Sequence, residues 1–343
     1  SNYINSMLQT LMVKLNPTEE QYQMLLDTMH KFNEACNEIA DTVFQMGRAN
    51  KVEAHHMVYY DIRRKYGLSA QLTVRAISKV VEAYKRDKSI KPQFRPDGAI
   101  VYDQRILSWK GLEAVSITTL QGRQIVPIVI GNYQRARLDR VRGQADLILV
   151  DGIFYIGVVV EVTEEPQYKP QGVLGVDVGI KYLAVDSDGE VHTGEKLNAT
   201  RERMDSLKTR LQSKGTKSAK RHLKKLSKKT ARFTKDTNHC ISKRLVAKAK
   251  DTLRAIAIEE LDGVRSRATV RKAQRRSLHT WSFYQLRQFL AYKAAIAGVP
   301  LILVDPETHP GLARLAGTSL RLIGLPETNS CVNPVASLGL RIT

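Results

Sequence analysis

The stretch Gly172–Gly189, GVLGVDVGIKYLAVDSDG, decides how the second half of the chain folds. It opens with an apolar run of strand-forming residues, and a second short run with an Asp-Gly turn follows, as in a hairpin. One acidic residue, Asp177, interrupts the apolar run. Burying a carboxylate without a partner is costly in free energy. The stretch therefore predicts that Asp177 holds a metal ion or acts as a catalytic acid.

The composition predicts a nucleic-acid partner. The chain has 343 residues, 43% of them hydrophobic, which is enough for a large core in two or three domains. Its formal net charge is +20, from 54 Lys and Arg against 34 Asp and Glu. So positive a chain is typical of proteins that bind nucleic acid, although charge that serves only solubility stays an alternative. No apolar run reaches about 18 residues, so we expect no membrane partner. The expected location is the cytoplasm, which the scattered cysteines favour.

The positions of the three cysteines argue against a disulfide framework and against a zinc site. Cys36, Cys240 and Cys331 lie far apart, and no two of them form a CxxC pair. Reduced thiols fit this pattern best, and Cys36, which falls on the apolar face of a predicted helix, is expected to pack in the core.

The first half of the chain reads as a small antiparallel barrel with helices inserted in it. Leu8–Leu15 favours a strand, and Thr18 with Gln21 forms a capping box before a helix with apolar residues at helical spacing. Two further helices are predicted at about 51–66 and 69–88. Short runs rich in Val, Ile and Tyr follow from 94 to 162 and predict the remaining strands, which the strand at Leu8–Leu15 would complete.

The second half alternates strands and helices and therefore predicts an α/β domain. After a linker at 164–170 we expect a strand at 173–178, a hairpin, and one long helical section at about 199–251. A strand at 254–258, a basic loop, a helix at 282–297 and a strand at 300–304 complete it. In the hairpin, Asp186 and Asp188 are interpreted as ordinary turn residues.

Two clusters of positive charge are the predicted contacts with nucleic-acid phosphates. Residues 201–235 contain 14 Lys or Arg, and too few acids accompany them for the i,i+4 pairs that stabilise a solvated helix. Such contacts would supply affinity without sequence preference. The residues of the first cluster are Lys217, Lys220, Arg221, Lys224, Lys225, Lys228, Lys229 and Arg232, and those of the second are Arg265, Arg267, Arg271, Lys272, Arg275 and Arg276.

Asp177 and Glu259 are the predicted metal ligands. Glu259 lies at the end of the strand in LRAIAIEEL, and two acids on neighbouring strands can share Mg²⁺, which prefers carboxylate oxygens. Glu260 alternates to the opposite face and is a poorer candidate. Actin-like ATPases and sugar kinases also carry an acid-x-Gly strand here, but they need a later glycine-rich phosphate loop that this sequence lacks.

Several blocks in a fixed order resemble the TnpB family, the transposon-associated RNA-guided nucleases ancestral to type V CRISPR effectors. The blocks are GVDVGIKYLAVDSDG, NHCISKRLV (238–246), IAIEELDGVR (256–265), HTWSFYQLRQFLAYKA (279–294) and YGLSAQLTVRAISKVVEAYK (66–85), and the resemblance covers about residues 7–306.

The resemblance implies a fold that combines α/β and β-barrel parts. It implies a wedge β-barrel (1–15 and 90–166) that carries a helical recognition insertion (17–88), then a RuvC-like domain of RNase H fold (171–306). It further implies a guide RNA from the transposon end (omega RNA), one protein per RNA, and double-stranded target DNA with a short adjacent motif. By motif match, Asp177 and Glu259 are the first two of three catalytic acids. Gln71, Arg75 and Lys79 are the candidates for reading the adjacent motif, with a solvated helix face as the alternative.

The sequence after residue 306 departs from the family. The family continues there with a zinc ribbon and the third catalytic Asp, whereas residues 307–343 contain one cysteine and no Asp. We considered the possible codons of residues 307–318 and 331–342 in a reading frame shifted by one base. In that frame they can encode the cysteines of the zinc ribbon and an Ala-Asp pair. We hypothesise that residues 307–343 are a frameshifted remnant of the zinc ribbon and of the segment with the third Asp. The alternative is an unrelated C-terminal extension. Asp305 lies before this segment and is a poor substitute for the third Asp. No zinc is expected, and the Mg²⁺ site is expected to be weak.

The predicted function is RNA-guided DNA binding with cleavage lost or strongly impaired, for example in a guided repressor. Two other functions stay open, namely an active RNA-guided RuvC endonuclease and a protein that only binds RNA.

Overall fold

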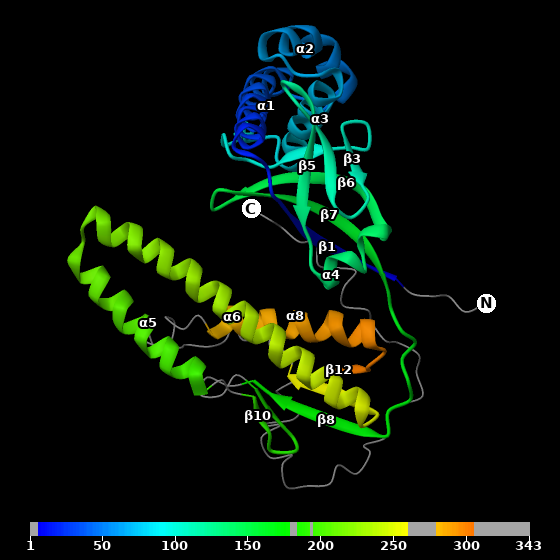
Figure 1. Cartoon of the computed structure of the whole chain (residues 1–343), viewed down its shortest axis with the longest axis vertical. Helices are drawn as coiled ribbons and strands as arrows, with labels where there is room; N and C mark the ends of the chain where they lie inside the picture. The colour runs from blue at the N-terminus through cyan, green and yellow to red at the C-terminus, as the bar shows by residue number, and fades with distance from the viewer. Residues whose placement is uncertain (1–5, 179–183, 193–194, 260–278, 305–343) are drawn as a thin grey trace. The chain divides into compact units, whose positions relative to one another are not determined.

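The computed structural model describes residues 6–178, 184–192, 195–259 and 279–304 (Figure 1). The chain divides into two compact units, Ser1–Glu164 and Glu165–Thr343. The division falls at the start of the predicted linker, where residues 164–170 form neither helix nor strand. Within the described ranges no helix combines the length and apolar character needed to span a membrane.

The first unit contains a seven-stranded antiparallel sheet of barrel-like form. The strands run in the order β2-β6-β7-β1-β5-β4-β3. The first strand pairs along its length with β7, from Ser6↔Thr163 to Lys14↔Tyr155, and its end pairs with β5, so the prediction that it completes the barrel is confirmed. The strand β3 was not predicted. The bounds are β1 Ser6–Leu15, β2 Ile100–Tyr102, β3 Leu107–Lys110, β4 Ala114–Thr119, β5 Gly122–Val129, β6 Val141–Val150 and β7 Ile153–Thr163, with α4 Asn132–Arg135 and η1 Leu138–Arg140 between β5 and β6.

Three helices stand between β1 and β2, as predicted: α1 Glu19–Met46, α2 Lys51–Tyr66 and α3 Ala70–Arg86. The predicted capping box is present, because the Thr18 hydroxyl accepts from the Gln21 backbone and the Gln21 side chain accepts from the Thr18 N–H. Gly47 ends α1 with a φ of 65°, a conformation that suits glycine. The Cys36 side chain is fully buried, which confirms its packing role.

A buried polar cluster fastens the helices to the segment that leads into β2. The Asn33 amide donates to the carbonyls of Met29, Pro96 and Gly98, and its oxygen accepts from Lys79 Nζ at 3.0 Å. The Lys79 ammonium also donates to the Ala99 carbonyl. Each of these groups would be costly to bury without its partner, so the cluster fixes where the helical insertion rejoins the barrel.

The variant Asn33→Leu tests this cluster. It removes the donor to Pro96 and Gly98 and the acceptor of Lys79, so we expect a loss of about 2–4 kcal/mol in the free energy of unfolding. Urea unfolding of the full chain, followed by circular dichroism, measures it. The control Gln23→Ala breaks only an exposed bond to Asp27 and should change stability by less than about 0.5 kcal/mol. Equal effects of the two variants would contradict the assignment.

The second unit is built on a mixed five-stranded sheet. The order is β10-β9-β8-β11-β12, with β8, β11 and β12 parallel to one another and β9 antiparallel to both β8 and β10. The predicted α/β class is confirmed. The bounds are β8 Gly172–Asp177, β9 Ala184–Asp186, β10 Val191–His192, β11 Arg254–Glu259, β12 Leu301–Val304, α5 Glu195–Lys214, α6 Lys217–Asp251 and α8 His279–Ala297.

The helical section predicted at about 199–251 is present, and it consists of two helices whose division the sequence analysis did not specify. Gly215, with a φ of 63°, separates α5 from α6, and the Thr216 hydroxyl caps α6 by accepting from the Ala219 N–H. The two helices pack antiparallel on a small core of Met204, Leu211, Ala219 and Leu226 (Figure 1). The charge run concealed this break, since a lone glycine in a helical pattern is tolerated.

Helices α6 and α8 form the layer that covers the sheet. Leu245 and Ala249 of α6 and Leu286 and Leu290 of α8 pack in one core with Leu174 and Ile256 of the central strands. Between the two helices, the Asn238 amide donates to Gln285, and Lys293 Nζ donates to the His239 carbonyl and the Ser242 hydroxyl. The blocks at 238–246 and 279–294 thus shape this layer.

Candidate functional site

The parallel strands β8 and β11 bring Asp177 and Glu259 to one edge of the sheet. Their register runs from Arg254↔Gly172 to Ile258↔Val176, so the next position along each strand holds an acidic residue. Both are the last residues of their strands. The carboxyl ends of parallel strands are where open α/β sheets place their ligand sites. On the other side of β11, Glu259 pairs with Val304, and Asp305 follows outside the described residues.

The expectation that Asp177 is buried within its strand is wrong. It ends β8, and it is partly exposed, whereas Leu174 and Val176 before it are fully buried. The apolar run continues in sequence, but the strand stops, so the carboxylate reaches solvent and avoids much of the cost of burial. This position makes the carboxylate accessible to a hydrated cation. Two carboxylates at adjacent strand ends are hard oxygen donors and fit Mg²⁺ in chemistry.

A second acidic cluster gathers around an ammonium group. Lys248 Nζ of α6 lies 2.5 Å from Asp186 Oδ2, 2.9 Å from Glu190 Oε2 and 3.1 Å from Asp188 Oδ2. Asp186 Oδ2 is also 3.0 Å from His192 Nε2, and Arg254 donates to both carboxylate oxygens of Asp188. The hairpin β9–β10 is thereby tied to α6 and to the start of β11.

This cluster corrects the interpretation of Asp186 and Asp188 as turn residues alone. Asp186 Oδ1 does accept from the N–H groups of Asp188 and Glu190, which is turn chemistry, but its side chain is fully buried and also holds Lys248. The ligand atoms of Asp186, Glu190 and His192 lie within 4.8 Å of one another, a spacing that suits a metal ion. The Lys248 ammonium already bonds two of these carboxylates, so a divalent ion would meet its repulsion.

Hydrogen bonding shifts the pKa values of the cluster in favour of the charged forms. Burial alone would raise the pKa of Asp186 and lower that of Lys248, but the hydrogen bonds between them outweigh it and shift both pKa values the opposite way. The Arg254 hydrogen bonds lower the pKa of Asp188. Asp186, Asp188 and Lys248 are therefore ionised across the neutral range.

We predict that Lys248→Met destabilises the second unit by about 2–4 kcal/mol at pH 7, because it leaves the buried Asp186 carboxylate without its cation. A carboxyl whose folded pKa is lowered contributes stability above its unfolded pKa of about 3.8, and the contribution disappears as the pH falls through the folded value. The difference between wild type and variant should thus shrink below about pH 4. Urea unfolding between pH 3 and 7 measures it.

Lys250→Met is the matched control, since Lys250 lies on the same helix and makes an exposed pair with Glu165. Its effect should stay below about 0.5 kcal/mol. A Lys248→Met effect that stays constant down to pH 3 would contradict the assignment.

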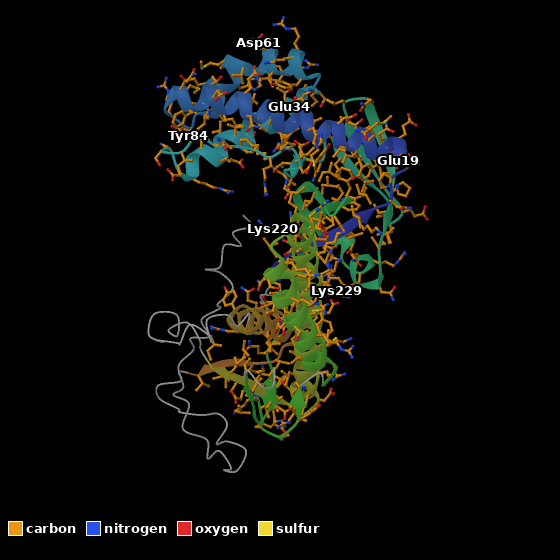
Figure 2. The ribbon with its side chains drawn as sticks, turned by 90° about the vertical axis from the view of Figure 1, so that its left-hand side faces the viewer. Glu19, Glu34, Asp61, Tyr84, Lys220 and Lys229 are labelled. Carbon is orange, nitrogen blue, oxygen red and sulfur yellow. The ribbon has the colours of Figure 1, made fainter. Side chains whose placement is uncertain are left out.

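The first predicted basic cluster lies on the exposed surface of α6. All eight of its side chains are exposed. Six of them, Lys217, Lys220, Arg221, Lys224, Lys225 and Lys229, make no ion pair with another described residue. Figure 2 labels Lys220 and Lys229 along this helix. Unpaired surface cations along one long helix are what binding to a phosphate backbone requires. The second cluster, at residues 265–276, lies outside the described residues.

The three candidates for reading an adjacent motif make contacts inside the first unit. Arg75 pairs with Asp103 at 2.9 Å, and Gln71 donates to the same carboxylate. Lys79 is largely enclosed, and burial lowers its pKa. Contact of Gln71 and Arg75 with DNA stays a prediction. To make it, both side chains would have to leave Asp103 and bond the DNA instead. The Lys79 ammonium donates to Asn33 and to the Ala99 carbonyl, so it is already engaged within the fold and does not suit the reading of a DNA motif.

Sequence reasoning did not single out Lys248 or Lys293. Both are lysines on helices whose partners lie 50 or more residues away in sequence. Burial lowers the pKa of Lys293 to about 8. A local signal did exist for Lys248, namely the dense run of acids in DSDGE at 186–190 opposite a helix of lysines, but it does not say which lysine is the partner.

Comparisons with known proteins agree with this architecture. The OrfB_IS605 family model, described as "Probable transposase", matches residues 157–265. The CRISPR-associated endodeoxyribonuclease Cas12f1 of Sulfoacidibacillus thermotolerans is 34% identical over 86 residues, which are 25% of this chain and 19% of that protein. The match therefore spans about a fifth of the length of this curated relative.

A solved Cas12f1–sgRNA–target DNA complex contains a chain of similar fold. It superposes with a TM-score of 0.52 at 10% identity and covers 88% of this chain and 90% of that chain. A CRISPR-Cas12f ternary complex gives a TM-score of only 0.33, at 13% identity over 83% and 72% of the chains, and adds no argument. These matches support the resemblance of the chain to the TnpB family. The fold that they share with this chain combines a barrel-like sheet that carries a helical insertion with an α/β unit.

Proposed function

We propose that this protein is an RNA-guided DNA-binding protein whose RuvC-like unit cleaves DNA poorly or not at all. The observation that carries the binding part is the row of exposed, unpaired cations on α6, which suits a guide RNA and its target strand. The resemblance to the TnpB family supports a guide RNA from the transposon end, one protein for each RNA, and duplex DNA with an adjacent motif as partners.

The loss of cleavage rests on the acidic residues. The adjacent ends of β8 and β11 supply Asp177 and Glu259, and these two residues would hold Mg²⁺, the ion that activates water and stabilises the leaving oxygen in phosphodiester hydrolysis. Residues 306–343 contain no Asp, so the third acid of the family pattern has no counterpart there. With two ligands, occupancy of the ion and alignment of the attacking water both suffer. A protein that binds and does not cut would act as a guided repressor.

One assay with two readouts tests this function. The chain is purified with its co-expressed transposon-end RNA, the guide is reprogrammed, and matched duplex DNA beside a randomised flank is added with Mg²⁺. We expect retention of the matched duplex without cutting, and Asp177→Ala should change neither readout. A mismatched guide is the control for retention. Cutting that Asp177→Ala abolishes would show an active endonuclease instead, and failure to retain matched DNA would show a protein that only binds RNA.

The role of α6 is tested by the salt dependence of RNA binding. Lys220→Gln and Lys224→Gln each remove one exposed cation, so each should make the slope of log K against log salt less negative by about 0.7–0.9. The affinity is measured between about 50 and 200 mM salt. Lys31→Gln on α1 removes the same charge from an i,i+3 pair in the other unit and should leave the slope unchanged. Equal slopes for all variants would exclude α6 from the interface.

A further inference from the structure

The outward face of α2 carries a row of exposed side chains that combines an aliphatic residue, two aromatic rings and an arginine. Val52, His56, Tyr60 and Arg63 follow one another at spacings of four, four and three residues, which places them on one side of the helix; we name these four residues the α2 stripe. The Tyr60 side chain is 77% exposed and Val52 is 66% exposed. Met57 lies beside the stripe and is 55% exposed. Single exposed apolar residues are ordinary, but Val52, Met57 and Tyr60 are gathered on one exposed part of α2, which suits a partner.

The core of the unit does not use this face. The opposite side of α2 supplies the buried residues Ala54, Val58 and Ile62, and α2 packs on α1 and α3. Figure 1 shows α2 as the helix of this unit that lies farthest from the strands, and Figure 2 labels Asp61 of α2 at the outer edge of the helices. The stripe is therefore open to solvent along its whole length.

Neighbouring rings hold Tyr60 in place. Its ring meets the Tyr59 ring edge to face, with centroids 5.1 Å apart, and Tyr59 in turn stacks on His55 at 4.5 Å. Tyr59 and His55 are only half-exposed, so they are partly fixed by packing. The Tyr60 ring thus stands on a supported base and presents a free face, which reduces the conformational entropy that a flat ligand would cost on binding.

The charge around the stripe is positive. Arg63 is exposed and makes no ion pair with any other described residue. Arg64 pairs with Asp61 three residues before it, but both side chains are more than 70% exposed, so water or a phosphate can replace either partner at little cost. An anion that also has a flat apolar face matches this surface, and nucleotides have both properties.

We propose that the α2 stripe is a stacking platform for one unpaired base of single-stranded RNA, with Tyr60 beneath the base and Arg63 on the adjoining phosphate. Unpaired RNA bases are commonly received by aromatic side chains, and cations beside the ring track the backbone. The proposal goes beyond the proposed function and rests on it only in that the ligand is RNA. It does not require that DNA be bound or cut.

Photocrosslinking with the full chain tests the platform. A single-stranded ribo-oligonucleotide that carries 4-thiouridine is bound, irradiated and mapped on the peptides of α2 and α6. We expect a crosslink at Tyr60, a yield on α2 that falls by about 5-fold or more in Tyr60→Ala, and an unchanged yield in Tyr60→Phe, since only the ring is needed. The yield on α6 should not change in either variant. The thermal midpoint should also stay the same, because Tyr60 is so exposed.

Three results would overturn the proposal. The first is a yield on α2 no higher than on Tyr133, an exposed tyrosine of the same unit. The second is a deoxyribo-oligonucleotide that crosslinks to α2 as well as the RNA does, which would assign the platform to DNA. The third is a concentration-dependent dimer in sedimentation that Tyr60→Ala abolishes, which would assign the stripe to a second copy of the chain. The DNA-retention assay under the proposed function is a separate experiment. If it shows no retention of matched DNA, the crosslinking test of the α2 stripe can still succeed or fail.

Discussion

The parallel pairing of β8 with β11 is the constraint on which the second unit depends. Five consecutive register pairs fix the two strands, and both end in an acidic residue at the same level. A slip of one residue would turn the faces of β11 over and separate Glu259 from Asp177. The buried side chains Leu174, Val176, Ile256 and Ile258 oppose this slip, because it would take the two Ile side chains away from the residues of α6 and α8 on which they pack. The apolar core therefore determines that Asp177 and Glu259 stand side by side at the ends of their strands.

The basic residues of the chain form two groups, one enclosed in the fold and one exposed on the surface, and the two groups have different roles. Lys79, Lys248 and Lys293 are partly or largely enclosed, and each satisfies carbonyls, carboxylates or hydroxyls that would otherwise lack a partner. Five exposed lysines of α6 lack such partners among the described residues, namely Lys217, Lys220, Lys224, Lys225 and Lys229. Enclosed lysines support the fold, whereas the α6 lysines are available to phosphates. A count of basic residues in the sequence does not distinguish the two groups.

The sequence predicted the elements well and the long-range polar contacts poorly. Apolar periodicity and the capping box located β1, α1 and the strands of the barrel, because those signals are local. Adjacent acidic strand ends were also predictable, since β8 and β11 both read as buried strands. The partners of Asp186, Gln71 and Lys79 were not, because each contact joins positions more than 15 residues apart that only the folded chain brings together. The break at Gly215 was concealed by the charge run around it.

Binding of Mn²⁺, a substitute for Mg²⁺, tests most directly whether one site is formed by the ends of β8 and β11. Titration calorimetry on the full chain would compare wild type with Asp177→Ala, Glu259→Ala and the double variant. If the two carboxylates share one ion, each single variant should lose nearly as much affinity as the double variant, so the effects are far from additive. Additive losses, or binding that neither substitution changes, would contradict the shared site and with it the role assigned to this edge of the sheet.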